Sequence, residues 1–186
     1  MQSKRPDAAT RRTQLLDAAD AVFRTHGVHA PLELVVERAG VGRATLYRQF
    51  PDRHAILLAL LERSLERLHT YAQGLNDRPD AFFLLLQHLA DRIVHSPALS
   101  DYWRSTGLRD PRFTEARKHV WDAFAAALER AKTSGLLRDD VQLHDLSLLS
   151  GMLGAALRGD SEAERRRLAQ RALDIIHFGL RPQPHP

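Results

Sequence analysis

The feature that most constrains this chain is residues 39–53, where a glycine-rich break separates two helical patterns. Gly40–Gly42 interrupt an apolar helix and allow two helices to pack closely at a sharp angle. Leu46 and Phe50, four residues apart, are expected to face the core, which leaves the polar side of residues 43–50 outside. The segment therefore predicts a helix-turn-helix whose second helix has the shape and charge to enter a major groove of DNA.

The composition indicates a globular chain. Its net positive charge is concentrated at the N-terminal end, which suits a polyanionic partner there. Hydrophobic residues make up 44% of the 186 residues, and residues 1–54 hold +3 of the net charge of +4. The absence of cysteine excludes disulfides, thiolate metal sites and cysteine nucleophiles. The first residues lack the apolar run of a signal peptide, and the longest apolar run, Phe82–Leu86, is too short to span a bilayer. We therefore expect a cytoplasmic protein.

Glycine, proline and N-cap residues divide the rest of the chain into helices, and no strand alternation occurs. Thr10 is a candidate N-cap, Gly27 a C-terminal stop, and Asp52 the N-cap of a connecting helix ending near Gln73 or Gly74. The pattern predicts an all-α fold, with a three-helix DNA-binding domain over 1–54, including an arm at 1–9, and a larger helical domain over 55–186. The other expected helices are Thr10–His26, Pro31–Ala39, Arg43–Phe50, Ala81–His95, Pro97–Gly107, Pro111–Ser134, Val141–Leu157 and Ser161–Phe178.

Five segments follow one another at a specific spacing near the N-terminus: Leu15–Ala19, Phe23–Gly27, Val35–Val41, Thr45–Arg53 and Ala55–Leu61. Together they resemble the DNA-binding domain of the TetR/AcrR family of one-component repressors. The resemblance implies a homodimer whose recognition helices enter successive major grooves of a palindromic operator. It also implies that a small effector in the C-terminal domain moves the connecting helix, about 52–73, and releases the DNA. Beyond the DNA-binding domain the resemblance covers architecture only.

The chain departs from the family pattern at three positions. Pro31 stands where the family usually has a threonine that caps the second helix and touches phosphate, and proline can do neither. Glu33 stands where a basic or polar residue is usual, and its charge repels phosphate. We therefore expect the second helix to add less to DNA affinity than is typical. Arg53 replaces a family lysine and keeps its charge.

Three residues of the recognition helix are predicted to contact DNA on physical grounds. Arg43 can pair with guanine O6 and N7, Ala44 is small enough to approach a thymine methyl, and the Tyr47 hydroxyl can reach phosphate. Arg48 is expected to reach either a base or a phosphate.

Three further contacts are expected with the DNA backbone. The resemblance implies phosphate binding by Thr45, and Gln49 faces either phosphate or solvent. A cation in the first turn of a helix opposes the macrodipole, so Arg53 is expected to be stabilised by a nearby phosphate. The basic residues of the arm are left open between solvent and DNA: Lys4, Arg5, Arg11 and Arg12.

Two groups of residues in the C-terminal half carry the remaining expectations. Small and apolar residues at helical spacing allow close helix packing, and the resemblance implies that they form the dimer interface: Ser147, Ser150, Gly151, Gly154, Ala155, Ile175 and Phe178. Aromatic and polar residues of the middle helices are candidates to line the cavity of an apolar or amphipathic organic effector, although such residues are more often core: Tyr71, Phe82, Leu86, His88, His95, Trp103, Trp121 and Phe124.

The sequence gives less support to a metal site, an enzyme or a constitutive DNA-binding protein. His88, Asp91 and His95 share one helix face with the spacing of metal ligands, but a polar face or an ion pair is the commoner arrangement, and we expect no metal and no cofactor. No catalytic motif emerges, so an enzyme is not expected. The alternative to a ligand-responsive repressor is a constitutive DNA-binding protein with a sealed core over residues 80–135.

Overall fold

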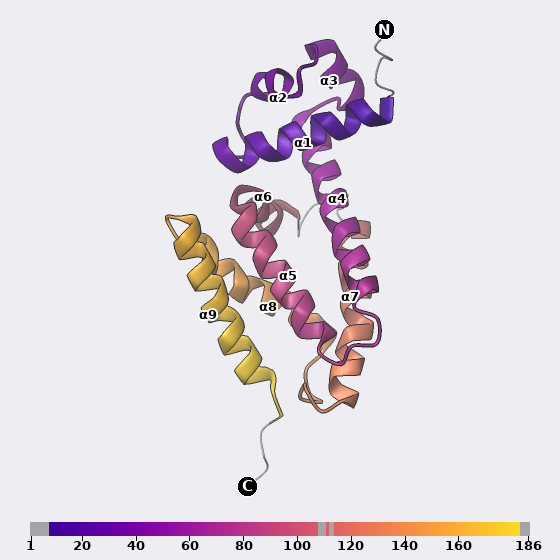
Figure 1. The fold of residues 1–186 in the computed structure, drawn as a ribbon, viewed down its shortest axis with the longest axis vertical. Coiled ribbons are helices and arrows are strands. Elements are labelled where there is room, and N and C mark those ends of the chain that lie inside the picture. Colours follow the sequence, from indigo (N-terminus) through magenta and orange to yellow (C-terminus); the bar gives the residue numbers. More distant parts are fainter. Residues whose placement is uncertain (1–7, 108–110, 112–113, 183–186) are drawn as a thin grey trace, which may run out of the picture. The chain divides into compact units, whose positions relative to one another are not determined.

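The computed structural model describes residues 8–107, 111 and 114–182, and within them every regular element is a helix (Figure 1). This confirms the expected all-α class. The chain divides into two compact units, Met1–Arg63 and Ser64–Pro186. The division falls within a helix and lies further along the chain than the expected boundary at residues 54 and 55. No helix of the described part is long and apolar enough to cross a membrane.

The N-terminal unit is built from α1 (Ala8–His26), α2 (Leu32–Ala39), α3 (Arg43–Gln49) and the first part of α4 (Arg53–Gly74). Its core is made by apolar side chains that recur at helical spacing, so that each helix buries one face. The largest of these side chains are almost fully buried: Leu15, Phe23, Leu46, Phe50, Ile56 and Leu57.

The helix ends follow local rules with two shifts from expectation. α1 begins at Ala8, so Thr10 lies inside the helix and is not its N-cap, whereas Gly27 ends the helix with φ +81° as expected. Phe50 is extended rather than helical, because the following Pro51 disfavours the helical conformation. Asp52 caps α4 as expected, since its Oδ1 accepts a hydrogen bond from the Ala55 N–H at 2.8 Å.

The turn between α2 and α3 depends on one of its two glycines. Gly40 has φ +63°, and its N–H donates to the Glu37 carbonyl, while the Val41 N–H reaches the Val36 carbonyl. This left-handed end satisfies carbonyls of the last turn of α2. Gly42, the residue before α3, has φ −79° and ψ 152°, a conformation open to any residue.

Arg63 is one of the α4 residues that contact α1 within the N-terminal unit. Its Nη1 donates to Asp17 Oδ1 at 2.5 Å, its Nη2 reaches the Leu16 carbonyl at 3.4 Å, and the side chain is only 18% exposed. Asp20 lies at 4.0 Å from the same guanidinium. These contacts tie the first half of α4 to α1 within one unit.

The C-terminal unit surrounds a core to which α5 (Ala81–His95), α7 (Thr114–Thr133) and α9 (Glu162–Leu180) contribute (Figure 1). Two expected helices are broken. The segment after Ser96 forms α6 (Pro97–Tyr102) and a π-helical turn, η1 (Trp103–Gly107). The segment expected as Val141–Leu157 forms two 3₁₀ turns around a short helix: η3 (Leu143–Asp145), α8 (Leu146–Leu153) and η4 (Gly154–Arg158). Glycines at 151 and 154 weaken a continuous helix there.

The entry into α9 requires a close backbone approach. Ser161 caps the helix by accepting a hydrogen bond from the Glu164 N–H at 3.1 Å. A Cβ at Gly159 would lie 2.7 Å from the Arg165 backbone nitrogen, so only glycine fits before this turn. The cap and the close approach fix where α9 starts.

Replacing each turn glycine by serine tests how the α2–α3 turn is specified. Gly40→Ser forces a β-carbon into the left-handed region, and we expect it to lower the free energy of unfolding by about 1–2 kcal/mol. Gly42→Ser adds a capping hydroxyl before α3, and we expect it to raise stability by a few tenths of a kcal/mol, roughly. Urea unfolding at one fixed protein concentration measures both. Equal losses in the two variants would contradict the assignment.

Candidate DNA interface and sensor region

The outer face of α3 presents most of the residues predicted to contact DNA. Arg43, Ala44, Tyr47 and Arg48 are exposed, and Tyr47 keeps 48% of its surface. Thr45 and Gln49 are half-buried. The buried Leu46 lies on the opposite side, as a helical period requires. The helix therefore offers solvent a short row of basic and aromatic side chains held on a packed base.

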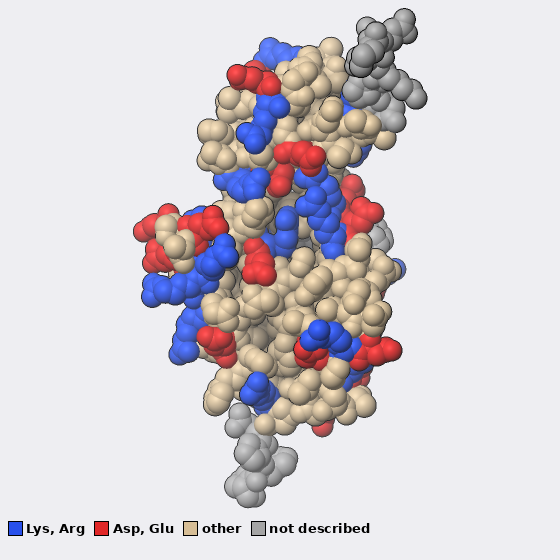
Figure 2. Space-filling view, viewed as in Figure 1, with Lys and Arg blue, Asp and Glu red and all other residues tan. Residues whose placement is uncertain are grey.

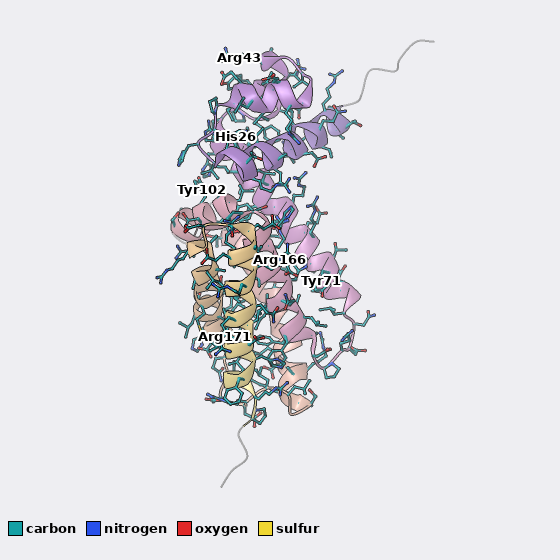
Figure 3. All side chains as sticks on the ribbon, turned by 60° about the vertical axis from the view of Figure 1, so that its left-hand side comes forward. His26, Arg43, Tyr71, Tyr102, Arg166 and Arg171 are labelled. Atoms are coloured by element: carbon teal, nitrogen blue, oxygen red, sulfur yellow. The ribbon has the colours of Figure 1, made fainter. Side chains whose placement is uncertain are left out.

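Arg43 is not alone at the start of α3. Its Nη2 forms an ion pair with Glu33 Oε1 from the first turn of α2, and both side chains remain more than half exposed. Figure 3 labels Arg43 on the α2–α3 edge of the N-terminal unit. Sequence reasoning expected Glu33 only as a charge that repels phosphate. The structure joins it to the arginine with the strongest case for reading a base.

The surroundings of Arg53 differ from the expectation that only a nearby phosphate would stabilise its positive charge. Its Nη1 donates to the Val28 carbonyl at 2.7 Å, and its guanidinium lies 5.7 Å from the centre of the Phe23 ring. A carbonyl hydrogen bond and a cation–π contact offset the unfavourable macrodipole. Arg53 thus has a structural role within the unit, and phosphate contact by it stays a prediction.

Arg12 has contacts within the N-terminal unit, whereas the sequence left its role open between solvent and DNA. Its guanidinium lies 4.4 Å from the centre of the Phe50 ring, and its Nη1 donates to the Gln49 carbonyl at 3.4 Å. It therefore covers the C-terminal end of α3. No local pattern distinguishes Arg12 from the neighbouring Arg11, because its partners lie far along the chain. Lys4 and Arg5 lie outside the described residues.

The predicted interface residues of α8 and α9 fall into two groups. Ser147, Gly151 and Ala155 are exposed on α8 and η4, and Ile175 and Phe178 keep 48% and 75% of their surface on α9. Figure 3 labels Arg166 and Arg171 along α9. Sequence reasoning missed two members of this face, Leu148 and Met152, which are 65% and 37% exposed. Their four-residue spacing in α8 was the available signal.

Gly154 and Ser150 do not belong to that exposed face. Gly154 is buried, and a β-carbon there would lie 3.2 Å from Arg104 Cδ, so the small residue accommodates a side chain of the same chain. Ser150 is half-buried, on the side of α8 that faces its own core. Both residues therefore take part in packing within the chain, and their contribution to a dimer face stays a prediction.

The candidate effector residues also separate into core and partly accessible groups. Phe82 and Phe124 are buried, and their rings meet edge to face at 5.7 Å in the core, where Leu86 is buried as well. Tyr71 stacks on His88 with ring centres 4.6 Å apart. Trp103 and Trp121 are half-buried, and His95 is exposed. Tyr71, labelled in Figure 3, comes from the end of α4 and His88 from α5.

His88 and Trp103 each bury a polar nitrogen. His88 Nε2 and Trp103 Nε1 have no hydrogen-bond partner among the described residues. Burial lowers the pKa of His88, and the nearby positive charge of Arg92 lowers it further, so the imidazole is neutral at pH 7. Buried polar groups are normally paired, which makes both nitrogens candidates for hydrogen bonds to a bound molecule.

Two open hollows lie on the C-terminal unit. One, of about 670 Å³, runs between α5 and α9 and is lined by residues that include Phe83, Leu86 and His177. The other, of about 480 Å³, lies between α6 and the α8–η4 segment and includes Arg104 and Gly154. Of the candidate effector residues only Leu86 lines either of these two hollows. The aromatic candidates therefore lie outside these two hollows.

The helix face of His88, Asp91 and His95 shows no metal site. Among the described residues no group of three potential ligands lies close enough to hold an ion. Asp91 accepts a hydrogen bond from Gln87 Nε2 at 3.2 Å, and His88 stacks on Tyr71. The polar-face interpretation of these residues agrees with those contacts.

Two family models match separate parts of the chain. Residues 15–60 match the model of bacterial regulatory proteins of the tetR family. Residues 78–182, more than half of the chain, match the C-terminal domain of SbtR-like transcriptional regulators. The two matches follow the order of the two compact units.

Relatives of this chain include further transcriptional regulators. The transcriptional repressor Rv1474c of Mycobacterium tuberculosis is 27% identical over 190 residues, covering 93% of this chain and 94% of that protein. The transcriptional activator FasR of Mycolicibacterium smegmatis is 33% identical over 90 residues, and that match spans 41% of its length.

Among solved structures, the TetR regulator SCO0520 of Streptomyces coelicolor has a TM-score of 0.69 at 29% identity, covering 92% of this chain and 99% of that chain. FadR of Bacillus subtilis, solved with stearoyl-CoA, has a TM-score of 0.68 at 16% identity, covering 90% and 98%. All four proteins are transcriptional regulators rather than enzymes.

Proposed function

Because the chain belongs to the TetR family of transcriptional regulators, we propose that it is a homodimeric repressor that binds a palindromic operator and releases it when a small organic effector binds. The observation that carries the proposal is the exposed face of α3, with Arg43, Tyr47 and Arg48 on a helix anchored by Leu46. Such a regulator acts on DNA in the cytoplasm.

The proposed DNA-reading surface combines base and phosphate contacts. Arg43, at the start of α3, offers its guanidinium fork to guanine O6 and N7. Ala44 lies beside it for a thymine methyl, while Tyr47 and Arg48 face the backbone together with Thr45 and Gln49. Two copies of this surface about 34–36 Å apart, or a multiple of that distance, match a palindromic site.

Two arginine variants separate base reading from phosphate binding. We expect Arg43→Ala to weaken operator binding by about 1–3 kcal/mol and to relax one position of the site. We expect Arg48→Ala to weaken all sequences alike and to lower the salt slope by about 0.9, because a phosphate contact is lost. Gel-shift titrations over a salt series measure both, with Arg78→Ala, in the exposed loop before α5, as the charge-matched control. If both variants bind like the wild type, these contact assignments are wrong.

The proposed dimer interface uses the exposed apolar face of α8 and α9. Leu148, Met152, Ile175 and Phe178 leave large apolar side chains in solvent, and Gly151, which shares α8 with the first two, has no neighbouring atom within 4 Å of a built β-carbon. Apolar residues gathered on neighbouring helices favour burial against a partner. A second copy of the same face gives the two-fold arrangement that a palindromic operator requires.

A single glycine tests this interface without disturbing the monomer. We expect Gly151→Leu to shift the protein toward monomer and to reduce operator affinity, because the added side chain, for which the single chain leaves room, would project into the proposed interface. Gly74→Leu makes the same change at another open position, on α4, and is expected to leave the dimer intact. Sedimentation and gel shift measure the two properties. A wild-type chain that sediments as a monomer at micromolar concentration would overturn the proposal.

The proposed effector site lies near Tyr71, His88, Trp103 and Trp121 in the C-terminal unit. The nitrogens of His88 and Trp103 that have no partner among the described residues can form hydrogen bonds to a ligand, and the neutral imidazole adds no charge. These groups suit an amphipathic organic molecule with an apolar body. Stearoyl-CoA, present in the structure of a fold relative, is a suitable first probe of that class. The effector would act by biasing the orientation of α4, which runs from one compact unit into the other.

Reciprocal binding tests regulation rather than binding alone. We expect operator DNA to weaken effector binding by the same factor by which the effector weakens operator binding. A thermal-shift screen, begun with stearoyl-CoA and shorter acyl chains, identifies the effector. Calorimetric titration with and without operator then measures the coupling. Equal effector affinities in both titrations would show a ligand that does not regulate.

One observation favours the alternative of a constitutive DNA-binding protein. Phe82, Leu86 and Phe124 are buried against one another and their neighbours, which is the sealed packing that a protein without an effector needs. Under this alternative no compound in the screen changes operator affinity, while the Arg43 variant still loses DNA binding.

A further inference from the structure

The ion pair between Glu33 and Arg43 links the two helices of the helix-turn-helix. Glu33 lies in the first turn of α2, and Arg43 is the first residue of α3. Their side chains are 53% and 66% exposed, so the pair lies on the surface. Figure 2 shows acidic atoms beside basic ones on the N-terminal unit. Glu33 is therefore an acidic residue on the surface of α2 and α3 that is otherwise suited to a polyanion.

The pair compensates an unfavourable position of Arg43. A cation at the start of a helix opposes the macrodipole, and Gly42 provides no side-chain cap for α3. Glu33 is favourably placed at the start of α2 and supplies the missing negative charge. Exposed ion pairs contribute little to folding stability. Stability alone therefore does not account for an acid at this edge.

The carboxylate changes what the Arg43 guanidinium can do. A guanidinium has five N–H donors in a rigid fork, and the ion pair with Glu33 is made through Nη2. The remaining donors are sufficient for a bidentate contact with one guanine. Without Glu33, the long and flexible side chain is free to turn to the nearest phosphate. With Glu33, phosphate meets a negative charge beside the arginine.

We propose that Glu33 is a specificity-determining residue of the DNA interface, which positions the Arg43 guanidinium for a base edge and keeps it from the phosphate backbone. The inference rests on the proposed function as a DNA-binding regulator. Glu33 lowers affinity for any duplex by charge repulsion, and it lowers affinity for the wrong sequence more. The acid that departs from the family pattern thereby increases discrimination at the cost of total affinity.

The test compares four proteins on two duplexes. The proteins are the wild type, Glu33→Gln, Arg43→Ala and the double variant, and Glu37→Gln is the matched control. Glu37 is an exposed acid on the same helix with no ion pair to a described residue. One duplex is recovered by the wild type from a random-sequence library, and the other is a scrambled version of it. Dissociation constants are measured over a salt series.

The expected result for Glu33→Gln is tighter binding of the scrambled duplex and a smaller ratio between the two affinities, by about threefold to tenfold. The slope of log affinity against log salt on the scrambled duplex should become steeper by about 0.9, because Arg43 then contacts a phosphate. Glu37→Gln should leave the affinity ratio unchanged. In the Arg43→Ala background Glu33→Gln should no longer change the ratio, since the coupled partner is absent.

Two results contradict the inference in different ways. If Glu33→Gln and Glu37→Gln change the affinities for both duplexes by the same factor, Glu33 acts only as a repelling charge, and the positioning role is wrong. If Glu33→Gln still lowers the ratio in the Arg43→Ala background, the effect does not pass through Arg43, and the inference is again wrong. A wild type that enriches no sequence from the library would instead refute the proposed function itself.

Discussion

The surface proposed to read DNA depends on the burial of Leu46 and Phe50 in the N-terminal core. α3 has only seven residues, and a helix of that length is not stable by itself in water. Its shape therefore comes from packing, with Leu46 fully buried on one side and Phe50 buried just past its end. Arg12 covers that end by its contacts with the Phe50 ring and the Gln49 carbonyl. The exposed row on the other side of α3 exists only because this anchor holds.

The arginines of the N-terminal unit perform two different tasks. Arg12, Arg53 and Arg63 point into the unit, where they pair with carbonyl oxygens, carboxylates or aromatic rings. Arg43 and Arg48 point outward. A net charge therefore overstates the charge that is available to DNA. The Glu33 carboxylate reduces it further, because it pairs with Arg43, the residue proposed to contact a base.

Small residues in the C-terminal unit also divide by task, although they look alike along the chain. A small residue at 154 leaves room for the Arg104 side chain of the same chain. Glycine at 159 leaves room for the Arg165 backbone. Gly151 has open space around it and lies beside the exposed Leu148 and Met152. Spacing identifies positions where something approaches closely. It does not distinguish an approaching side chain of the same chain from a second subunit.

The sequence by itself determined the helical class, the helix-turn-helix and most helix limits, because these follow from local rules: apolar periodicity, the Asp52 cap, the Gly27 stop and the break before Pro51. It also identified the outward residues of α3, since a helix with Leu46 buried must expose the opposite side. Only the tertiary structure decided the partners of Arg12, Arg43 and Arg53, the burial of Gly154 and the breaks on either side of α8. Those contacts join residues far apart in the chain or depend on which neighbours share a crowded core, and no local pattern of residue types carries that information.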